Sequence, residues 1–386
     1  MKKIILGISI ALVIILALFI VDRGGFVTKK MTYAGTLQLE NQVAIDQNEY
    51  AIMPNDSIMQ IGKESVICFT VNGSGNKKIL WEETAYTKYP IYSQNGNLIC
   101  VYDKQGYNGI VYNQNGKVYE LKVNLPILQV AINEKGYTAV LQKSNTESDS
   151  RSVITLFDES GNKMLDRISY EENGGVPITV AISDDGETFA ASYLDISNNN
   201  ILSKVIFFKI DGKELKDNLF SSFEFNGSIV THLKYIDNEN IIAVADNKLI
   251  KINLFNEKCN EVEIEDRISN VNLGFDDVIV LICKKNTNQF AGDAMYAEFY
   301  NTKLRKKKEQ VIYNTVNQVT NNQNLVACGN GSEYNVYSKY GITKCKTSFN
   351  VDVKQLLMCN KSNTVYVATS KGLDIYKMQN SSFMSN

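Results

Sequence analysis

The feature that most constrains this chain is an internal repeat of short apolar segments joined by tight turns. Three copies align without gaps, and they begin at Pro90, Pro126 and Pro177. Proline suits the first position of a strand because it cannot donate to a ladder hydrogen bond. Their turns contain Asn95-Gly96, Lys135-Gly136 and Asp185-Gly186. Glycine supplies the positive φ of a tight hairpin, so each copy predicts a strand, a turn and a second strand.

Each copy continues into a second hairpin that again has a glycine in its turn. These glycines are residues 116, 161 and 212, and looser versions of the same hairpin contain Gly75 and Gly341. Two hairpins make a four-stranded unit, and such units begin near residues 42, 88, 125, 176, 228, 267, 314 and 351. A spacing of about 40–50 residues is typical of propeller blades. The repeat therefore predicts an all-β propeller of eight four-stranded blades, with seven as the alternative.

The last unit lacks an outer strand of its own. The segment TYAGTLQLE, residues 32–40, alternates in the manner of a strand and lies near the other end of the sequence. We expect it to complete the last blade and so to join the two ends of the chain in one sheet. The 21 tyrosines and 16 phenylalanines of the chain also favour strands over helices.

The N-terminus contains an uncharged apolar run from Ile4 to Val21. As a helix this run would be about 27 Å long, close to the ~30 Å hydrocarbon core of a bilayer. No small-residue cleavage site follows it, which favours a retained signal anchor over a cleaved signal peptide. Lys2 and Lys3 precede the run, so the positive-inside rule places the N-terminus in the cytoplasm and the repeat domain outside it.

These observations predict a single-pass protein of the cell membrane with five segments. We expect a cytoplasmic stub at 1–3, a transmembrane signal anchor at 4–21, a linker at 22–33, the propeller at 34–378 and a tail at 379–386.

Charge and cysteine usage narrow the function classes. A net charge of -2 gives no basic field for nucleic acid, so that partner is excluded. The seven cysteines are widely spaced without a C-x-x-C pair and mostly lie in apolar stretches, which favours buried thiols over metal ligands. The only histidine, His232, has apolar neighbours and is expected to be a packed side chain. We expect no metal, no cofactor and no serine triad.

Acidic residues gather in the expected turns, at Asp184, Asp185, Glu187, Asp276 and Asp277. Carboxylates at such positions mostly form the turn itself. Glycosidases use a pair of carboxylates, so an envelope enzyme acting on glycans with carboxylates from blade loops stays open as an alternative.

One concentrated basic run contains Lys303, Arg305, Lys306, Lys307 and Lys308. It is a candidate contact for anionic lipid head groups or anionic wall polymers, and the alternative is a solvated hairpin between two strands. Trp81, the only tryptophan, ends an expected strand and is predicted to be a packing residue.

The hairpins at residues 132–142 and 182–192 resemble the second-strand turns of WD40-like and quinoprotein-like bacterial propellers. With the apolar N-terminus and the sequence ILWE at Ile79–Glu82, the chain resembles a family of membrane-anchored propellers of unknown function from Gram-positive anaerobes. The resemblance covers nearly the full chain and implies a fold and a location, without an activity. We therefore expect a non-enzymatic scaffold that binds an envelope protein or wall polymer.

Overall fold

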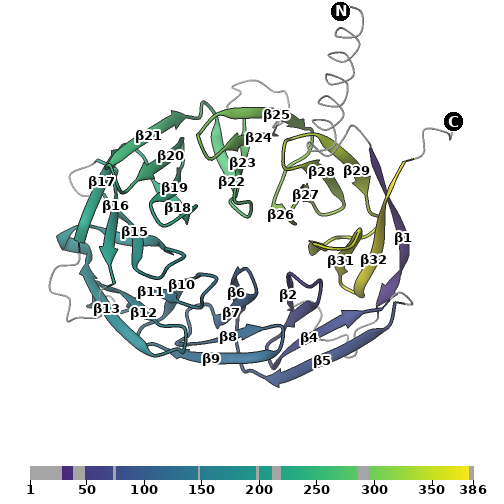
Figure 1. Ribbon diagram of the computed structural model, residues 1–386, viewed down its shortest axis with the longest axis horizontal. Coiled ribbons are helices and arrows are strands. Elements are labelled where there is room, and N and C mark those ends of the chain that lie inside the picture. Colours follow the sequence, from purple (N-terminus) through teal and green to yellow (C-terminus); the bar gives the residue numbers. More distant parts are fainter. Residues whose placement is uncertain are drawn as a thin grey trace, which may run out of the picture.

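The computed structural model describes residues 28–37, 48–72, 75–146, 148–196, 200–210, 219–285 and 295–381. Within them, eight antiparallel sheets of four strands each form a ring around a central axis (Figure 1). The prediction of an all-β propeller with eight four-stranded blades is confirmed, and the seven-blade alternative is wrong.

Blades 1 to 4 follow one another along the chain. Blade 1 contains β2 (Glu49–Ile52), β3 (Ile58–Ile61), β4 (Ser65–Val71) and β5 (Lys77–Thr84). Blade 2 contains β6 (Pro90–Asn95), β7 (Leu98–Asp103), β8 (Asn108–Asn113) and β9 (Gly116–Lys122). Blade 3 contains β10 (Ile127–Ile132), β11 (Thr138–Lys143), β12 (Arg151–Phe157) and β13 (Lys163–Tyr170). Blade 4 contains β14 (Val176–Ile182), β15 (Thr188–Asp195), β16 (Leu202–Lys209) and β17 (Leu219–Asn226).

Blades 5 to 7 repeat this order, and blade 8 takes its fourth strand from the N-terminal part of the chain. Blade 5 contains β18 (Val230–Tyr235), β19 (Asn240–Ala245), β20 (Lys248–Asn253) and β21 (Lys258–Glu263). Blade 6 contains β22 (Arg267–Asn272), β23 (Val278–Lys284), β24 (Met295–Asn301) and β25 (Lys306–Ile312). Blade 7 contains β26 (Gln318–Asn321), β27 (Leu325–Asn330), β28 (Glu333–Ser338) and β29 (Thr343–Ser348). Blade 8 contains β30 (Gln355–Met358), β31 (Thr364–Thr369), β32 (Gly372–Asn380) and β1 (Lys29–Leu37).

The position of a strand in its blade explains its residue pattern. The first strand of each blade lies near the axis and the last lies on the perimeter (Figure 1). The second strands β23 and β31 are almost continuously apolar and buried, because both of their faces pack against neighbouring blades. Perimeter strands such as β13 and β21 have mostly exposed or half-buried side chains. The repeat thus places its most hydrophobic segment in the middle of each blade.

The hydrophobic core is divided among the interfaces between blades. One buried cluster packs Val205 and Phe207 of blade 4 against Ile241 and Ile250 of blade 5. Seven further clusters of described residues fill the other seven interfaces around the ring. No blade can bury both of its faces alone, so each interface between neighbouring blades contributes to the stability of the ring.

The ring is closed by β1, which pairs antiparallel with β32 from Lys29 opposite Asn380 to Leu37 opposite Leu373. In Figure 1 the purple strand from the start of the chain lies beside the yellow strand from its end. The hypothesis that an early segment completes the last blade is confirmed. The strand begins before the expected propeller boundary at residue 34, and β32 continues beyond residue 378.

Glycine is required at two of the predicted hairpin turns. Gly136 and Gly186 have φ values of +101° and +78°, as the hairpin prediction demands. An added Cβ at Gly186 would lie 2.6 Å from Cδ2 of Tyr137 in blade 3, so both the backbone conformation and the close packing exclude a larger residue.

The helix in the described residues is a single turn of 3-10 helix, η2 (Glu171–Asn173), and none of those residues forms a helix able to cross a membrane. The expected anchor at residues 4–21 lies outside the described part of the chain.

Candidate functional site

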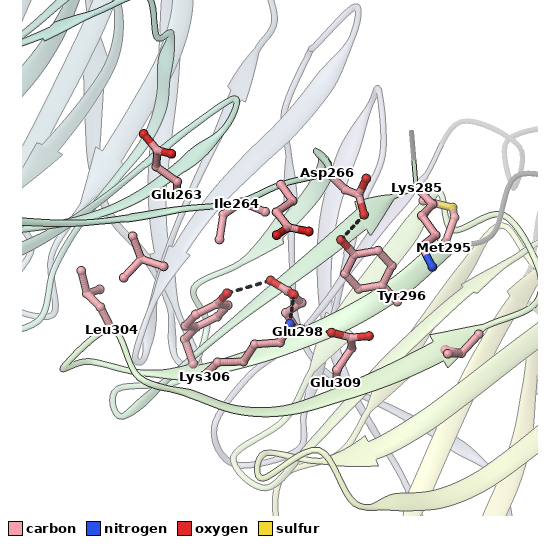
Figure 2. Close-up of a pocket in the computed structure, with 14 residues that line it drawn as sticks. Glu263, Ile264, Asp266, Lys285, Met295, Tyr296, Glu298, Leu304, Lys306 and Glu309 are labelled. Atoms are coloured by element: carbon pink, nitrogen blue, oxygen red, sulfur yellow. Dashed lines mark hydrogen bonds and ion pairs between the residues drawn. The ribbon is translucent and has the colours of Figure 1, made fainter. Parts of the chain in front are cut away.

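A groove lies between the outer strand of blade 5 and the outer strands of blade 6, with a volume of about 520 Å³. Figure 2 shows its side chains projecting from β21, from the segment that leads to β22, and from β24 and β25. Its charged and aromatic lining consists of Glu263, Glu265, Asp266, Lys285, Tyr296, Glu298, Tyr300, Lys306 and Glu309.

The alternation of β24 supplies the centre of the groove. Side chains two residues apart lie on the same face of a strand, so Tyr296, Glu298 and Tyr300 share one face. Glu298 pairs in register with Glu309 of β25, and two carboxylates opposite each other repel. Lys306 forms ion pairs with both carboxylates and so relieves that repulsion.

Glu298 is almost completely buried, and both of its carboxylate oxygens accept hydrogen bonds. The phenol of Tyr300 donates to Oε2 at 2.8 Å, and the ammonium of Lys306 donates to Oε1 (Figure 2). Partial burial alone would lower the pKa of Lys306, but its hydrogen bonds to Glu298 and Glu309 outweigh that effect and raise it. The charge of Lys306 is therefore fixed within the groove.

A second phenol donates to a carboxylate on the far side of the groove. The hydroxyl of Tyr296 lies 2.6 Å from Oδ2 of Asp266, which precedes β22. Burial raises the pKa of both Tyr296 and Tyr300, and the hydrogen bond that each donates to a carboxylate raises it further. Both tyrosines remain protonated donors at any physiological pH.

The groove combines negative charge with an apolar wall. Five carboxylates face two ammonium groups, and Val262, Ile264, Met295, Leu304 and Val311 supply the apolar surface. Glu263 and Glu265 are exposed at its edge. Such a surface attracts a cationic group that carries an apolar body, because opposite charge and apolar burial act together.

The structure separates the predicted basic run into two parts. Lys303 and Arg305 lie in the turn between β24 and β25, and Lys306, Lys307 and Lys308 lie on β25. All five residues are exposed, but only Lys306 lines the groove. The described residues supply no ion-pair partner for the other four. Lysines on a perimeter strand also discourage edge-to-edge pairing of sheets, which gives the run a structural role.

A second cavity of about 380 Å³ opens near the axis, among the inner strands of blades 2 to 5. Lys234 of β18 donates to the carbonyls of Leu273 and Phe275 at 2.7 and 3.0 Å and lies 3.6 Å from a carboxylate oxygen of Asp276. Burial lowers the pKa of Lys234 and raises the pKa of Asp184, which faces the same cavity. Lys234 thereby joins blade 5 to blade 6.

The acidic residues predicted to form turns have different surroundings. Asp184 and Asp276 come together from separate blades at the axial cavity. Asp185 stays within its own turn, where its carboxylate accepts hydrogen bonds from Ser183 and from the backbone of Glu187. Asp277 pairs with Lys339 of blade 7 at 2.9 Å.

The remaining predictions concern residues with structural roles. Trp81 stacks on Tyr112 of blade 2 and donates to the carbonyl of Gln114, which confirms it as a packing residue.

Six cysteines are buried free thiols, and Cys259 is an exposed one. His232 was expected to be packed, but its side chain reaches solvent beside the axis, where the surrounding protein lowers its pKa. Among the described residues, no group of three or more His, Cys, Asp or Glu could hold a metal ion.

The comparisons with known proteins identify a family and a fold. The Family of unknown function DUF5711 matches residues 28–378, which span the ring from β1 to β32. The chain belongs to this family. No curated protein sequence matches it significantly.

A solved structure of a designed protein supports the fold of this DUF5711 member. The computationally designed Ika8 protein is 13% identical and covers 89% of this chain and 100% of its own, with a TM-score of 0.59. The WD40 domain of Pan2 from Neurospora crassa is 10% identical and covers 76% of this chain and 89% of its own, with a TM-score of 0.48. At such identities the similarity to the designed protein concerns the fold alone.

Sequence reasoning missed the groove because its carboxylates come from segments that only the ring brings together. One local signal was available. In the strand MYAEFYN, Glu298 occupies a position in a continuously buried segment, and a buried carboxylate requires partners.

Proposed function

We propose that this protein is a membrane-tethered, extracytoplasmic binding scaffold of the cell envelope in a Gram-positive anaerobe. Residues 4–21 are its anchor, Lys2 and Lys3 keep the N-terminus in the cytoplasm, and the propeller lies outside. Support for the tether comes from the length and charge pattern of the sequence, and support for the scaffold comes from a rigid ring with its loops and grooves exposed.

The acidic groove between blades 5 and 6 is the single observation that carries the binding role. Glu298, Lys306 and Tyr300 are fixed by their mutual contacts, so the groove is preformed. Glu263 and Glu265 add exposed negative charge at its edge, and Val311 supplies exposed apolar surface. This chemistry favours a basic, partly apolar segment of an envelope protein over an anionic wall polymer.

A cross-linked pull-down of the full-length protein from native membranes tests this proposal. The variant Glu263→Gln with Glu265→Gln removes two exposed groove charges without touching a buried contact. A matched variant, Glu82→Gln with Glu172→Gln, removes two exposed charges elsewhere on the ring. We expect the wild type and the matched variant to capture the same partners, and the groove variant to lose them. Equal capture by all three proteins would exclude the groove as the binding site.

The tether has a separate test. A tag at the C-terminus should be degraded when intact cells are treated with protease, because the propeller is expected outside the cytoplasm. A protected tag in intact cells, together with a degraded tag in lysed cells, would contradict the proposed orientation.

A further inference from the structure

A basic pocket lies between blades 7 and 8, apart from the acidic groove, with a volume of about 550 Å³. Four lysines from four different segments line it, and its lining contains no carboxylate. These lysines are Lys29, Lys339, Lys344 and Lys361. Asparagine and serine side chains supply most of the remaining surface, so the lining is rich in hydrogen-bond donors.

Two carboxylates of the described residues near this pocket already have partners. Asp277 of blade 6 pairs with Lys339 at 2.9 Å, and the ring of Tyr340 lies 5.4 Å from the same ammonium. Asp56 accepts hydrogen bonds from the backbone of residues 360–362 beneath the pocket. Lys29 and Lys361 have no ion pair with any residue that the structure describes. Among the described residues, Lys29 and Lys361 therefore leave positive charge in the pocket that no carboxylate pairs with.

One of the four ammonium groups is held in a poorly hydrated position. Lys344 is 3% exposed, and burial lowers its pKa, with the charge of Lys29 as a second cause. An anion in the pocket would offset both effects, because it would lie close to several ammonium groups at once. Phosphate groups suit such a site, since their oxygens accept from several donors.

The pocket also lies where the chain arrives from its N-terminal apolar run. The first and third strands of a blade end on the same face of the ring, because neighbouring strands are antiparallel. Lys29 pairs with Asn380 on that face, beside the turn that contains Lys361. Residues 22–28 span at most roughly 25 Å when extended, so an anchor at residues 4–21 would keep this face close to the bilayer surface.

We infer that the pocket between blades 7 and 8 binds a phosphate-bearing anion, and that its source is the head group of an anionic phospholipid. The phosphate site follows from the lining alone. The lipid source additionally rests on the proposed membrane tether, and the two parts of the inference fail in different ways.

Native mass spectrometry of the full-length protein in detergent micelles tests the inference. Phosphatidylglycerol and phosphatidylcholine are added separately, and a third sample receives inorganic phosphate alone. The pocket variant is Lys29→Gln with Lys361→Gln. The control is Lys104→Gln with Lys122→Gln, which removes the same charge from exposed positions on the opposite face.

We expect phosphatidylglycerol to remain bound to the protein in the mass spectrum, and phosphatidylcholine to dissociate from it. The pocket variant should bind phosphatidylglycerol on the order of 10-fold more weakly, and the control variant should equal the wild type. Binding of inorganic phosphate without phosphatidylglycerol, again weakened in the pocket variant, would keep the site and assign it to a soluble phosphate ester. The inference is overturned if neither ligand binds, if both lipids bind equally, or if the pocket variant binds as the wild type does.

Discussion

The carboxylate of Asp56 in blade 1 accepts a hydrogen bond from the backbone N–H of Asn360 in blade 8, at 2.6 Å. The backbone N–H groups of Lys361 and Ser362 donate to the same carboxylate at 2.9–3.1 Å. One side chain therefore holds three successive amides of the turn between β30 and β31. This contact lies at the interface where the two ends of the chain meet, so it reinforces the closure made by β1.

Replacing Asp56 should weaken the closed ring. Asp56→Ala removes the charged acceptor and places alanine at a φ of 66°, so we expect the free energy of unfolding to fall by about 2–3 kcal/mol. Asp56→Asn keeps an acceptor and a residue that tolerates this conformation, so its loss should be about 1 kcal/mol. Urea unfolding followed by the fluorescence of Trp81 measures both. Equal losses in the two variants would contradict the role of the carboxylate.

The apolar side of β1 should contribute more to stability than its polar side. Leu37 is buried among residues of blades 8 and 1, and Thr32 on the same strand is exposed. Leu37→Ala should lower the free energy of unfolding by about 2–4 kcal/mol, whereas Thr32→Ala should stay within about 0.5 kcal/mol. The same unfolding experiment checks both variants. A neutral Leu37→Ala would show that β1 does not close the ring.

The single histidine gives a direct test of pH dependence. Although the side chain of His232 reaches solvent, the protein around the ring partly desolvates it and lowers its pKa from the usual 6.5, so the folded protein holds this proton more weakly than the unfolded chain. The free energy of unfolding is therefore unaffected by this group above pH 6.5, and it decreases as the pH falls from 6.5 toward the pKa of the folded state. NMR of protein labelled at histidine should show one signal that titrates below pH 6.5. A titration midpoint at or above pH 6.5 would contradict a lowered pKa for His232. The variant His232→Asn should reduce the dependence of the free energy of unfolding on pH below pH 6.5.

The buried carboxylate of the groove should depend on Lys306. Lys306→Met leaves Glu298 with Tyr300 as its remaining partner, and we expect a loss of about 1–2 kcal/mol, since the lysine side chain is 41% exposed to screening solvent. Adding Glu298→Gln should recover at least half of that loss, because the unpaired charge is then absent. Urea unfolding of the wild type, the two single variants and the double variant gives a double-mutant cycle for the two residues. Additive losses would show that the two residues do not interact.

The sequence predicted the ring but not the contacts across its interfaces. Local signals were sufficient for the blades, because the turn at Gly186 and the apolar run of β31 each reflect the chain's own backbone and burial requirements. The closing strand was predictable because one blade lacked a partner. Asp56 and Asn360 are too far apart in the sequence for any local pattern to connect them.

The candidate site shows the same limit. The basic run drew attention to Lys306, but its pairing with Glu298 depends on the register between β24 and β25. Asp266 reaches Tyr296 only because β22 pairs with β23 and β23 pairs with β24, which brings the start of blade 6 beside its third strand. Charge counted along the sequence therefore suggested a basic surface, whereas the folded groove beside it is acidic.

Site-specific photo-cross-linking in native membranes tests the proposed binding site most directly. Benzoylphenylalanine replaces Val311, a half-exposed residue of the groove, or Ile168, an equally exposed residue on the perimeter strand β13 of blade 3. The scaffold function predicts a discrete cross-linked partner from position 311 and none from position 168. Cross-links of equal yield from both positions, or from position 168 alone, would contradict the assignment of the groove as the binding site.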